Sequence, residues 1–449
     1  MKGKIIFTIP GNERAEREIF SAPRVPAAQR LVPSEKNYTG FMGFGVAITP
    51  SSCYELIHME ADERHALLQK IYGEDGLNLS VARLCVGSSD YSPELYSYDD
   101  VPFDTELAHF SIARDEEYII PIIKEILSIR PDLYLYASPW TPPAWMKTGG
   151  SLCGGYMRDE FVDCYANYFI KYIQAYGEHG IKISGITPQN EINTQSKSRM
   201  TACVWHPETE AKFIVTLRNK ANALGMPLDI WMYDHNFNDT ERVLWMLDNC
   251  QGLADAVSGV AFHYYEGTIE QTRCIAEKYP HLPMHFTEGG PRIDHNYATD
   301  WTKWGLMAIK TMNEGYGSMT GWNLMLDELG GPNIGPYMGF CGGLVTRDHR
   351  DETVSYSGMY KAYEHIAPYV TPASKLTPLR VDDAYDCCIA NYPKTERMIE
   401  GTLINNGAQK VAVIANPTGH SAQVQLDVGG KLWYIEVHTD SLVTAIIEE

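Results

Sequence analysis

Two glutamates, each at the end of a short run of β-forming residues, are the groups in this sequence best suited to chemistry. The run Ile183-Ser-Gly-Ile-Thr-Pro-Gln-Asn-Glu ends in Asn190 and Glu191, and the later run Met284-His-Phe-Thr-Glu ends in Glu288. A pair of carboxyl groups can break a glycosidic bond when one protonates the leaving oxygen and the other attacks the anomeric carbon. The two positions therefore predict a carboxylate pair, provided that the fold brings these strand ends together.

The two carboxyls must then hold different protonation states. If they lie about 5–5.5 Å apart, the ionised one acts as a nucleophile and the anomeric configuration is retained. We assign Glu191 as the acid/base and Glu288 as the nucleophile, and we expect the charge of Glu288 to raise the pKa of Glu191. A single glutamate at a strand end is more often a solvated loop residue, so the assignment depends on the pair.

The elements that would position the pair are an alternation of strands and helices that begins near residue 40. Strands are expected at 46–48, 79–86, 133–138, 183–187, 228–233, 257–264, 284–287 and 317–324. Helices are expected after them, at 51–72, 116–129, 159–179, 207–224, 240–249, 269–278, 298–313 and 357–366. Eight such units predict an α/β fold, a (β/α)8 TIM barrel over residues 40–366, in which the site lies at the C-terminal ends of the strands.

The remainder of the chain has a different texture. Short β-runs at 398–405, 410–415, 421–426, 431–438 and 442–447 are separated by Asn-Gly and Gly-Gly pairs typical of hairpins. Residues 1–38 contain one strand-like run, at 4–9, that can pair with them. We therefore expect an all-β side domain built from residues 1–39 and 367–449.

Composition excludes several classes of function. The formal net charge of −20 argues against a nucleic-acid partner, because such proteins need a cationic face. No segment approaches the roughly 18 apolar residues of a membrane span. No Walker A motif and no His or Cys pattern with zinc spacing occurs, so neither a cofactor nor a metal is expected.

The ten cysteines form no C-x-x-C pair and lie partly within apolar runs. Buried, reduced thiols favour a reducing compartment. We expect a cytoplasmic protein of bacterial type without a signal peptide, or a secreted one if a leader has been removed.

Further polar and aromatic residues are expected at the same strand ends. An aromatic ring can stack on the C–H face of a sugar while carboxyl and amide groups bind its hydroxyls. Asn190 would bind the 2-hydroxyl, and Tyr265 would orient Glu288. Trp140 and Trp322 suit a core equally well, and Asp90 suits a turn. Asp234-His235 and His263-Tyr264 end two further strands without an assigned role.

Five stretches resemble glycoside hydrolase family 30, the glucosylceramidase-like group. They are Gly43-Phe-Gly-Val-Ala-Ile-Thr, Ala137-Ser-Pro-Trp-Thr-Pro-Pro-Ala-Trp-Met-Lys, Thr187-Pro-Gln-Asn-Glu, Phe286-Thr-Glu and Gly321-Trp-Asn-Leu. The resemblance implies a retaining β-glycosidase with Glu191 as acid/base and Glu288 as nucleophile. It also implies that the side domain is a β-sandwich built from both chain ends. Sugar-binding roles are implied for Arg83, Asp90, Trp140, Asn190, Tyr265 and Trp322. A carboxylate at Asp90 favours a hexose, because the matching residue binds the 4- and 6-hydroxyls.

The sequence departs from the family pattern at two motifs. It has Gly-Phe-Met-Gly-Phe-Gly-Val-Ala where Gly-Phe-Gly-Gly-Ala is more usual, and Thr-Glu-Gly-Gly where lysosomal-type members have Ser-Glu-Ala. These departures place it outside the animal lipid-hydrolysing branch.

The expected function is an exo-acting, glucosylceramidase-like β-glucosidase that acts on a carbohydrate or glycoside. The alternatives are an endo-β-1,6-glucanase, a β-glycosidase for a fucoside, galactoside or xyloside, a metal-dependent barrel hydrolase and a non-catalytic carbohydrate-binding barrel. Homo-oligomerisation is left open.

Overall fold

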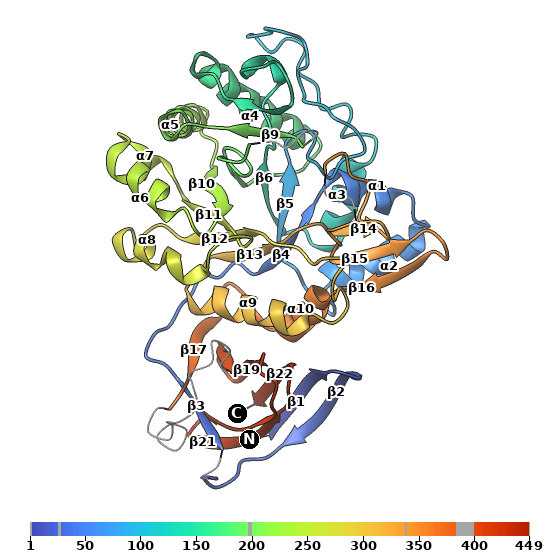
Figure 1. The fold of residues 1–449 in the computed structure, drawn as a ribbon, viewed down its shortest axis with the longest axis vertical. Helices are drawn as coiled ribbons and strands as arrows, with labels where there is room; N and C mark the ends of the chain where they lie inside the picture. The colour runs from blue at the N-terminus through green and yellow to red at the C-terminus, as the bar shows by residue number, and fades with distance from the viewer. Residues whose placement is uncertain (1, 26–27, 196–199, 337–338, 383–398, 449) are drawn as a thin grey trace. The chain divides into compact units, whose positions relative to one another are not determined.

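The computed structural model describes residues 2–25, 28–195, 200–336, 339–382 and 399–448. These divide into two compact units. One comprises residues 44–295 and 317–355, and the other comprises residues 1–43, 296–316 and 356–449. Figure 1 shows the strands and helices of each unit along the chain.

The first unit is built on a closed barrel of eight parallel strands. In chain order they are β4 (Phe44–Ile48), β5 (Val81–Cys85), β6 (Tyr134–Ser138), β8 (Gly185–Ile186), β10 (Asp229–Asn236), β11 (Gly259–His263), β12 (Met284–Glu288) and β13 (Ser318–Gly321). Strand β13 pairs with β4 and thereby closes the barrel. The predicted TIM barrel is confirmed, with each expected strand close to its expected place.

Helices separate successive barrel strands, as a parallel barrel requires. Those of this unit are α1 (Pro50–Ile57), α2 (Ala61–Tyr72), α3 (Ile119–Ile129), α4 (Val162–Glu178), α5 (Pro207–Ala223), α6 (Thr240–Asn249), α7 (Leu253–Ala256) and α8 (Arg273–Lys278). The single helix expected at 51–72 is two helices. The first begins at Pro50 because Thr49 caps it, with its hydroxyl 3.2 Å from the Ser52 amide.

Short helices and strands lie within the loops of the barrel. Single turns of 3-10 helix lie at η1 (Ala144–Met146), η2 (Asp159–Phe161) and η3 (Ile269–Thr272). Strands β7 (Cys153–Tyr156) and β9 (Ala202–Val204) pair with each other. Strands β14 (Met325–Asp327), β15 (Val345–Asp348) and β16 (Thr353–Tyr356) form a small sheet that follows β13.

The second unit contains one nine-stranded, mostly antiparallel sheet. Its strand order is β2-β1-β22-β19-β18-β17-β3-β20-β21. The bounds are β1 (Lys2–Ile9), β2 (Asn12–Ile19), β3 (Gln29–Pro33), β17 (Lys375–Val381), β18 (Glu400–Asn406), β19 (Gln409–Asn416), β20 (Ala422–Val428), β21 (Lys431–Val437) and β22 (Ser441–Glu448). A bridge between Ser21 and Trp433 links the two ends of the sheet, so that it curls on itself.

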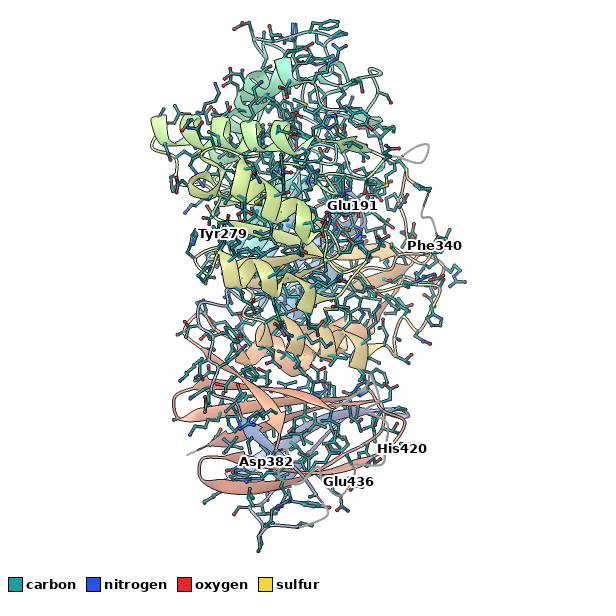
Figure 2. The ribbon with its side chains drawn as sticks, turned by 60° about the vertical axis from the view of Figure 1, so that its left-hand side comes forward. Glu191, Tyr279, Phe340, Asp382, His420 and Glu436 are labelled. Carbon is teal, nitrogen blue, oxygen red and sulfur yellow. The ribbon has the colours of Figure 1, made fainter. Side chains whose placement is uncertain are left out.

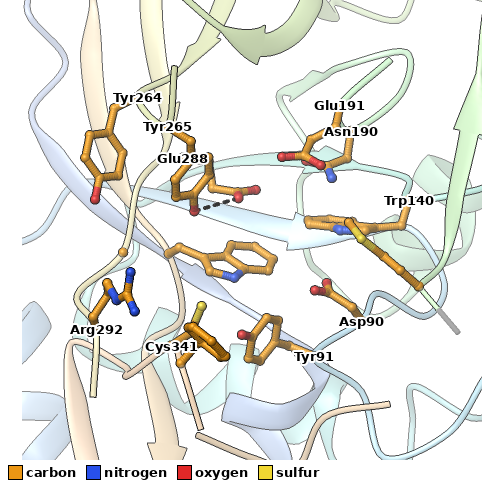
Figure 3. Close-up of a pocket in the computed structure, with 14 residues that line it drawn as sticks. Asp90, Tyr91, Trp140, Asn190, Glu191, Tyr264, Tyr265, Glu288, Arg292 and Cys341 are labelled. Atoms are coloured by element: carbon orange, nitrogen blue, oxygen red, sulfur yellow. Dashed lines mark hydrogen bonds between the residues drawn. The ribbon is translucent and has the colours of Figure 1, made fainter. Parts of the chain in front are cut away.

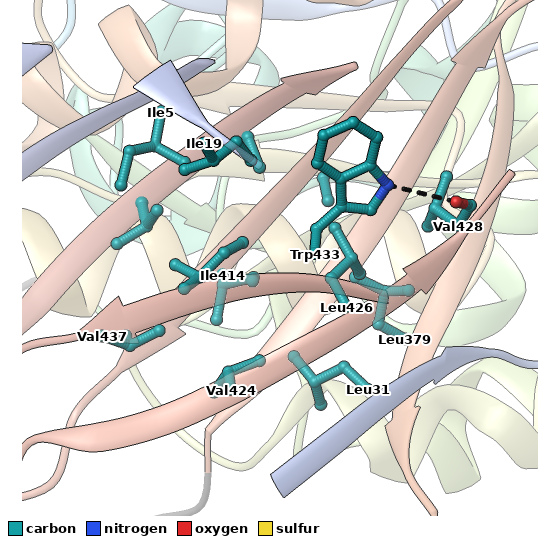
Figure 4. Packing of buried hydrophobic residues seen from close by; sticks show 14 of the residues in the cluster. Ile5, Ile19, Leu31, Leu379, Ile414, Val424, Leu426, Val428, Trp433 and Val437 are labelled. Atoms are coloured by element: carbon teal, nitrogen blue, oxygen red, sulfur yellow. Dashed lines mark hydrogen bonds between the residues drawn. The ribbon is translucent and has the colours of Figure 1, made fainter. Parts of the chain in front are cut away.

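The core of this unit lies inside the curled sheet. Trp433 is buried there and donates its indole N–H to the Val428 carbonyl at 3.2 Å. It belongs to the same hydrophobic cluster as Leu426, Ile414 and Ile5 (Figure 4). Helices α9 (Trp301–Asn313) and α10 (Gly358–Ile366), with the turn η4 (Ala367–Tyr369), belong to the same unit. Gly305 on α9 lies so close to Leu442 that a Cβ there would be 2.7 Å from its side chain.

The prediction of a side β domain built from both chain ends is confirmed. Its N-terminal part, however, contains more strands than the sequence predicts. One strand is expected before residue 40, and the structure has three. β3 enters between β17 and β20, and it pairs in parallel with β20. The predicted boundary at 366 stays a prediction, and Cys387, Cys388 and residue 398 lie outside the described residues.

Two further expectations concern cysteines and membranes. All eight described cysteines are free, and Cys53, Cys85, Cys164 and Cys203 are buried. Among the described residues no helix is both long enough and apolar enough to cross a membrane. Figure 2 shows Glu191 among the side chains of the barrel unit, and Asp382 and Glu436 in the sheet unit.

Candidate active site

A cavity of about 450 Å³ opens at the C-terminal ends of the barrel strands (Figure 3). Its walls come from loops that follow β5, β6, β8, β11, β12 and β13. The lining residues are Asp90, Tyr91, Trp140, Asn190, Glu191, Met200, Tyr264, Tyr265, Glu288, Gly290, Arg292, Trp322, Phe340 and Cys341. The barrel therefore brings seven of the eight predicted site residues to one cavity, and Arg83 lies buried behind its wall.

The carboxyl groups of Glu191 and Glu288 point toward each other across this cavity (Figure 3). An oxygen of each and a ring nitrogen of His263 all lie within 4.8 Å of one another. Glu288 is held on both oxygens: Tyr265 donates its hydroxyl at 2.9 Å, and Arg83 donates from Nη1 at 2.5 Å. The expected orienting contact from Tyr265 is present.

The backbone at these strand ends departs from ordinary strand geometry. Glu191, Tyr233, Asp234 and Asn323 have positive φ angles of 48°, 77°, 54° and 59°. Non-glycine residues in this region cost free energy and gather at functional sites. The amide of Glu191 donates to the Asp234 carbonyl at 2.9 Å, which ties two of these residues together.

Arg83 on β5 forms hydrogen bonds to two acids of the site and to Asn190. Its guanidinium donates to Asp234 at 2.8 Å, to the Asn190 side-chain carbonyl at 2.8 Å and to Glu288. Burial alone would lower the pKa of Arg83, but the charges of Asp234 and Glu288 outweigh it and raise that pKa. The arginine is therefore a permanent buried cation that fixes Glu288 and Asn190 together.

Asp234 on β10 is the principal residue that the sequence leaves without a role. Its buried carboxylate accepts hydrogen bonds from Arg83, from His263 Nε2 at 3.1 Å and from three hydroxyls, those of Ser138, Thr187 and Thr287. Burial would raise the pKa of Asp234, but Arg83 and His263 hold it well below its ordinary value. The residue is thus ionised and serves as the counter-charge of the site.

His263, the last residue of β11, lies between the two glutamates. Its Nδ1 is 3.7 Å from Glu191 Oε1 and 3.9 Å from Glu288 Oε1. This ring nitrogen is buried and has no hydrogen-bond partner. Burial lowers the pKa of His263, but Glu288, Asp234 and Glu191 outweigh it and raise that pKa to about 9. An imidazolium therefore faces both carboxyls at neutral pH.

The expected rise in the pKa of Glu191 is wrong for this structure. Burial does raise the pKa of Glu191, but His263 and His235 outweigh it and lower that pKa below its ordinary value. Burial and the charge of Glu191 instead raise the pKa of Glu288, an effect that His263 and Arg83 only partly offset. The sequence prediction fails because it considers the glutamate pair without the two imidazoles.

Aromatic rings form the opposite wall. Trp140 and Trp322 stack with their ring centroids 5.0 Å apart, and Tyr91 meets Trp322 edge-on. Arg83 lies 4.8 Å from the ring of Trp140, within the range of a cation–π contact. Both tryptophans are nearly buried yet line the cavity, so they belong to both the core and the site.

Asp90 lines the same cavity as these rings, and the charges that most affect its pKa are those of Glu288 and Glu191. Burial raises its pKa to about 8, with added contributions from the charges of Glu288 and Glu191. The Asp90 side chain is therefore largely a neutral carboxylic acid at neutral pH. In that form it can both donate and accept a hydrogen bond.

Several lining residues give no signal in the sequence. Phe340, Cys341 and Arg292 come from loops with no legible pattern, and the guanidinium of Arg292 lies 5.2 Å from the ring of Phe340. Arg292 and Phe340 stand at the rim, where Phe340 is 47% exposed, and Cys341 packs against the buried cluster that contains Trp140 and Trp322. A barrel motif cannot find them, because loop sequence does not encode which loop folds over the cavity.

Two groups of described residues bring three metal-ligating atoms within 4.8 Å. They are Glu191 with His263 and Glu288, and Glu55 with Asp327 and His349. In the first group, Arg83 and Tyr265 already occupy the oxygens of Glu288. The expected absence of a metal stays a prediction.

Comparison with known proteins agrees with this architecture. The chain is 33% identical to the lysosomal acid glucosylceramidase of Mus musculus over 338 residues, which are 67% of this chain and 62% of that protein. It is 26% identical to an endo-1,6-β-D-glucanase of Neurospora crassa, covering 92% of this chain and 86% of that one. The chain spans only about three fifths (62%) of the length of several curated relatives that it matches.

Solved structures give the same picture. The endo-β1,6-glucanase BT3312 superposes with a TM-score of 0.85 at 26% identity, over 100% of this chain and 99% of that chain. SrfJ of Salmonella typhimurium superposes over the whole of both chains with a TM-score of 0.89 at 23% identity, which shows the shared fold. The family model described as "Glycosyl hydrolase family 30 TIM-barrel domain" matches residues 41–370 of this chain. Barrel, side sheet and motif matches lead to one conclusion: the chain belongs to glycosyl hydrolase family 30.

Proposed function

We propose that the protein is a retaining, exo-acting β-glucosidase with Glu191 as acid/base and Glu288 as nucleophile. The observation that carries the proposal is the unequal environment of two facing carboxyls. Arg83 and Tyr265 donate to Glu288, which favours an ionised, fixed nucleophile. Glu191 accepts from neither of them, so its oxygens can turn toward a leaving group.

The spacing of the two acids supports retention of configuration. An oxygen of Glu191 lies within 4.8 Å of an oxygen of Glu288, which fits the separation of about 5–5.5 Å in retaining enzymes better than the roughly 6.5–9.5 Å of inverting ones. Glu288 would attack the anomeric carbon while Glu191 gives its proton to the departing oxygen. Glu191 would then deprotonate a water that releases the sugar from Glu288.

Only a minority of the enzyme molecules are expected to hold the two glutamates in the protonation states that the mechanism needs. The mechanism needs Glu191 protonated and Glu288 ionised, whereas the surrounding side chains and burial lower the pKa of Glu191 and raise that of Glu288. Because the two groups titrate as a pair, a fraction of the singly protonated enzyme still holds the proton on Glu191. The pH profile of kcat/KM would report the two values of the pair and not one glutamate each.

Exo action is supported by the closed end of the cavity. The amide of Ile334 donates to the Asp90 carbonyl at 2.9 Å, and a Cβ at Gly335 would lie 2.9 Å from that of Asp90. Trp140 and Trp322 complete this wall. We infer that a terminal glucosyl unit lies against Asp90 and that the segment of Ile334 and Gly335 blocks a longer chain there.

The nucleophile is tested with an aryl β-glucoside. Glu288→Gln should lower kcat by at least about a thousandfold, as expected for loss of a covalent catalyst. Glu191→Ala with azide should yield a β-glucosyl azide, because the small anion needs no general base. Normal turnover by Glu288→Gln, or an α-glucosyl azide from Glu191→Ala, would overturn the assignment.

A second candidate, an endo-β-1,6-glucanase, is favoured by the two glucanase relatives that cover most of the chain. Product analysis on a β-1,6-glucan separates the two. Glucose as the sole early product supports exo action, and a ladder of oligosaccharides supports endo action.

A further inference from the structure

A second cavity of about 530 Å³ adjoins the first, and Glu191 lines both. Its walls come from the loops that follow β8, β10 and β11. The lining residues are Glu191, Asn193, Thr194, Gln195, Met200, His235, Asn236, Asn238, Asp239 and Glu266. Among these described residues all but Met200 carry a hydrogen-bonding side chain.

Glu191 fixes what this cavity can be. The acid that protonates a leaving oxygen must lie within hydrogen-bond reach of it. With the glucosyl unit in the first cavity against Trp140, the leaving group extends past Glu191 to its other side. We propose that the second cavity is the leaving-group subsite and that it binds an uncharged, hydroxyl-rich group, namely a second sugar, and not an alkyl chain. The inference rests on the proposed function.

The polar groups of the subsite are held in place by one another. Asn193 donates to Asp239 at 3.0 Å and also contacts His235. Asn238 donates to Glu266 at 2.8 Å. Each carboxylate keeps further acceptor positions, and pairs of an amide beside a carboxylate suit the adjacent hydroxyls of a sugar ring.

An alkyl chain would enter this cavity at a cost in free energy. It would displace water from Asn193, Asn238, Asp239 and Glu266 and replace no hydrogen bond, and unpaired polar groups are costly. The negative charges of Asp239 and Glu266 also disfavour an anionic leaving group such as a phosphorylated or acidic sugar. The apolar alternative lies elsewhere, at the rim of the first cavity beside the exposed ring of Phe340.

The test compares substrates that share a β-glucosyl unit and differ in the leaving group. One set is β-1,3-, β-1,4- and β-1,6-linked glucose disaccharides, and the other is octyl β-glucoside, with a nitrophenyl β-glucoside as reference. We expect at least one disaccharide to be hydrolysed with a higher kcat/KM than octyl β-glucoside. Asn238→Ala should lower kcat/KM for that disaccharide about threefold to tenfold relative to octyl β-glucoside, as expected for one lost hydrogen bond.

Two control variants locate the effect. Asn249→Ala changes an exposed asparagine at the end of α6 that lines neither cavity, and it should leave the ratio of the two rates unaltered. Phe340→Ala should not lower the disaccharide rate selectively. The subsite assignment is overturned if octyl β-glucoside is preferred over every disaccharide, if Asn238→Ala lowers both rates equally, or if Phe340→Ala gives the selective loss. Failure of the nitrophenyl reference itself would instead refute the proposed function.

Discussion

Asp234→Asn tests the claim that one buried carboxylate balances the cations of the site. The substitution keeps size and shape but removes the charge that faces Arg83 and His263. It also turns one acceptor oxygen into an NH2 group. That group would face side chains that already donate, since Asp234 accepts from all five of its partners.

The magnitude follows from the burial of both partners. Asp234 and Arg83 are fully buried, and removing one member of a buried ion pair costs about 3–5 kcal/mol. In a domain of this size each kcal/mol lowers the melting temperature by about 2–4 °C, so we expect the melting temperature to fall by about 6 °C or more. Because the native pKa of Asp234 is lowered, its stabilisation is present above its unfolded pKa and is lost only when the pH falls toward the native value. Asp234 also helps to raise the pKa of His263 from 6.5 to about 9, and that linked stabilisation is lost as the pH rises through this range, so the difference between wild type and variant should shrink from about pH 6.5 toward pH 9.

The assay is calorimetry of the full chain, with hydrolysis of an aryl β-glucoside measured on the same samples. Asp248→Asn is the matched control, because Asp248 also accepts from a cation and a hydroxyl, those of Lys278 and Tyr279, each at 2.6 Å, but on the surface. The control should melt with the wild type, because exposed ion pairs contribute little. If Asp234→Asn melts within about 2 °C of the wild type and keeps its kcat, the carboxylate is not the counter-charge that we describe.

Three further predictions use other parts of the molecule. Asp90→Asn should retain more kcat/KM than Asp90→Ala below about pH 8 and should lose any titration near that pH, because the native side chain is neutral there; equal losses at all pH values would contradict this. His263→Asn should move the pH profile of kcat/KM to higher pH, since removing a cation raises the pKa of both glutamates; an unmoved profile would exclude an imidazolium at this position. Trp433→Ala should cost about 3–5 kcal/mol through the cavity that it leaves in the sheet unit, and calorimetry of the full chain should show a lower melting temperature; an unchanged melting temperature would contradict this.

Strand-scale features of the fold can be predicted because each has a local cause in the sequence. Continuous apolar runs mark strands that are buried on both faces, and eight of them alternate with helical patterns. Glu191 and Glu288 can be paired from the sequence alone, because a parallel barrel carries all of its strand ends to one edge. The second and third N-terminal strands are harder to predict, since Asn12–Ile19 consists mostly of charged residues, which equally suit a loop.

The missing part of the site depends on backbone irregularities that sequence patterns do not report. In β10 the pairing register shifts between Tyr233 and His235, and the extra residue turns Asp234 into the barrel. A second shift, between Phe262 and His263, sets His263 opposite Glu288. A regular strand would alternate these side chains between faces, so a period of two assigns Asp234 and His263 no common role.

The buried charges of the site explain how it can hold one proton over a wide range of pH. Arg83 and His263 supply two positive charges, and Asp234, Glu191 and Glu288 supply three carboxyls. In a medium of low dielectric the neutral total is favoured, and neutrality requires one proton on the glutamate pair. In that state one glutamate is protonated and can act as the acid, while the other is ionised and can act as the nucleophile. Removing the carboxylate of Asp234 makes the cluster neutral without that proton, so Asp234→Asn should move the alkaline limb of kcat/KM to lower pH. Removing the cation of His263 should move it to higher pH. Shifts of opposite sign from two neighbours that share one hydrogen bond are difficult to obtain from a general loss of packing, and they would identify charge balance as the property that the cluster maintains.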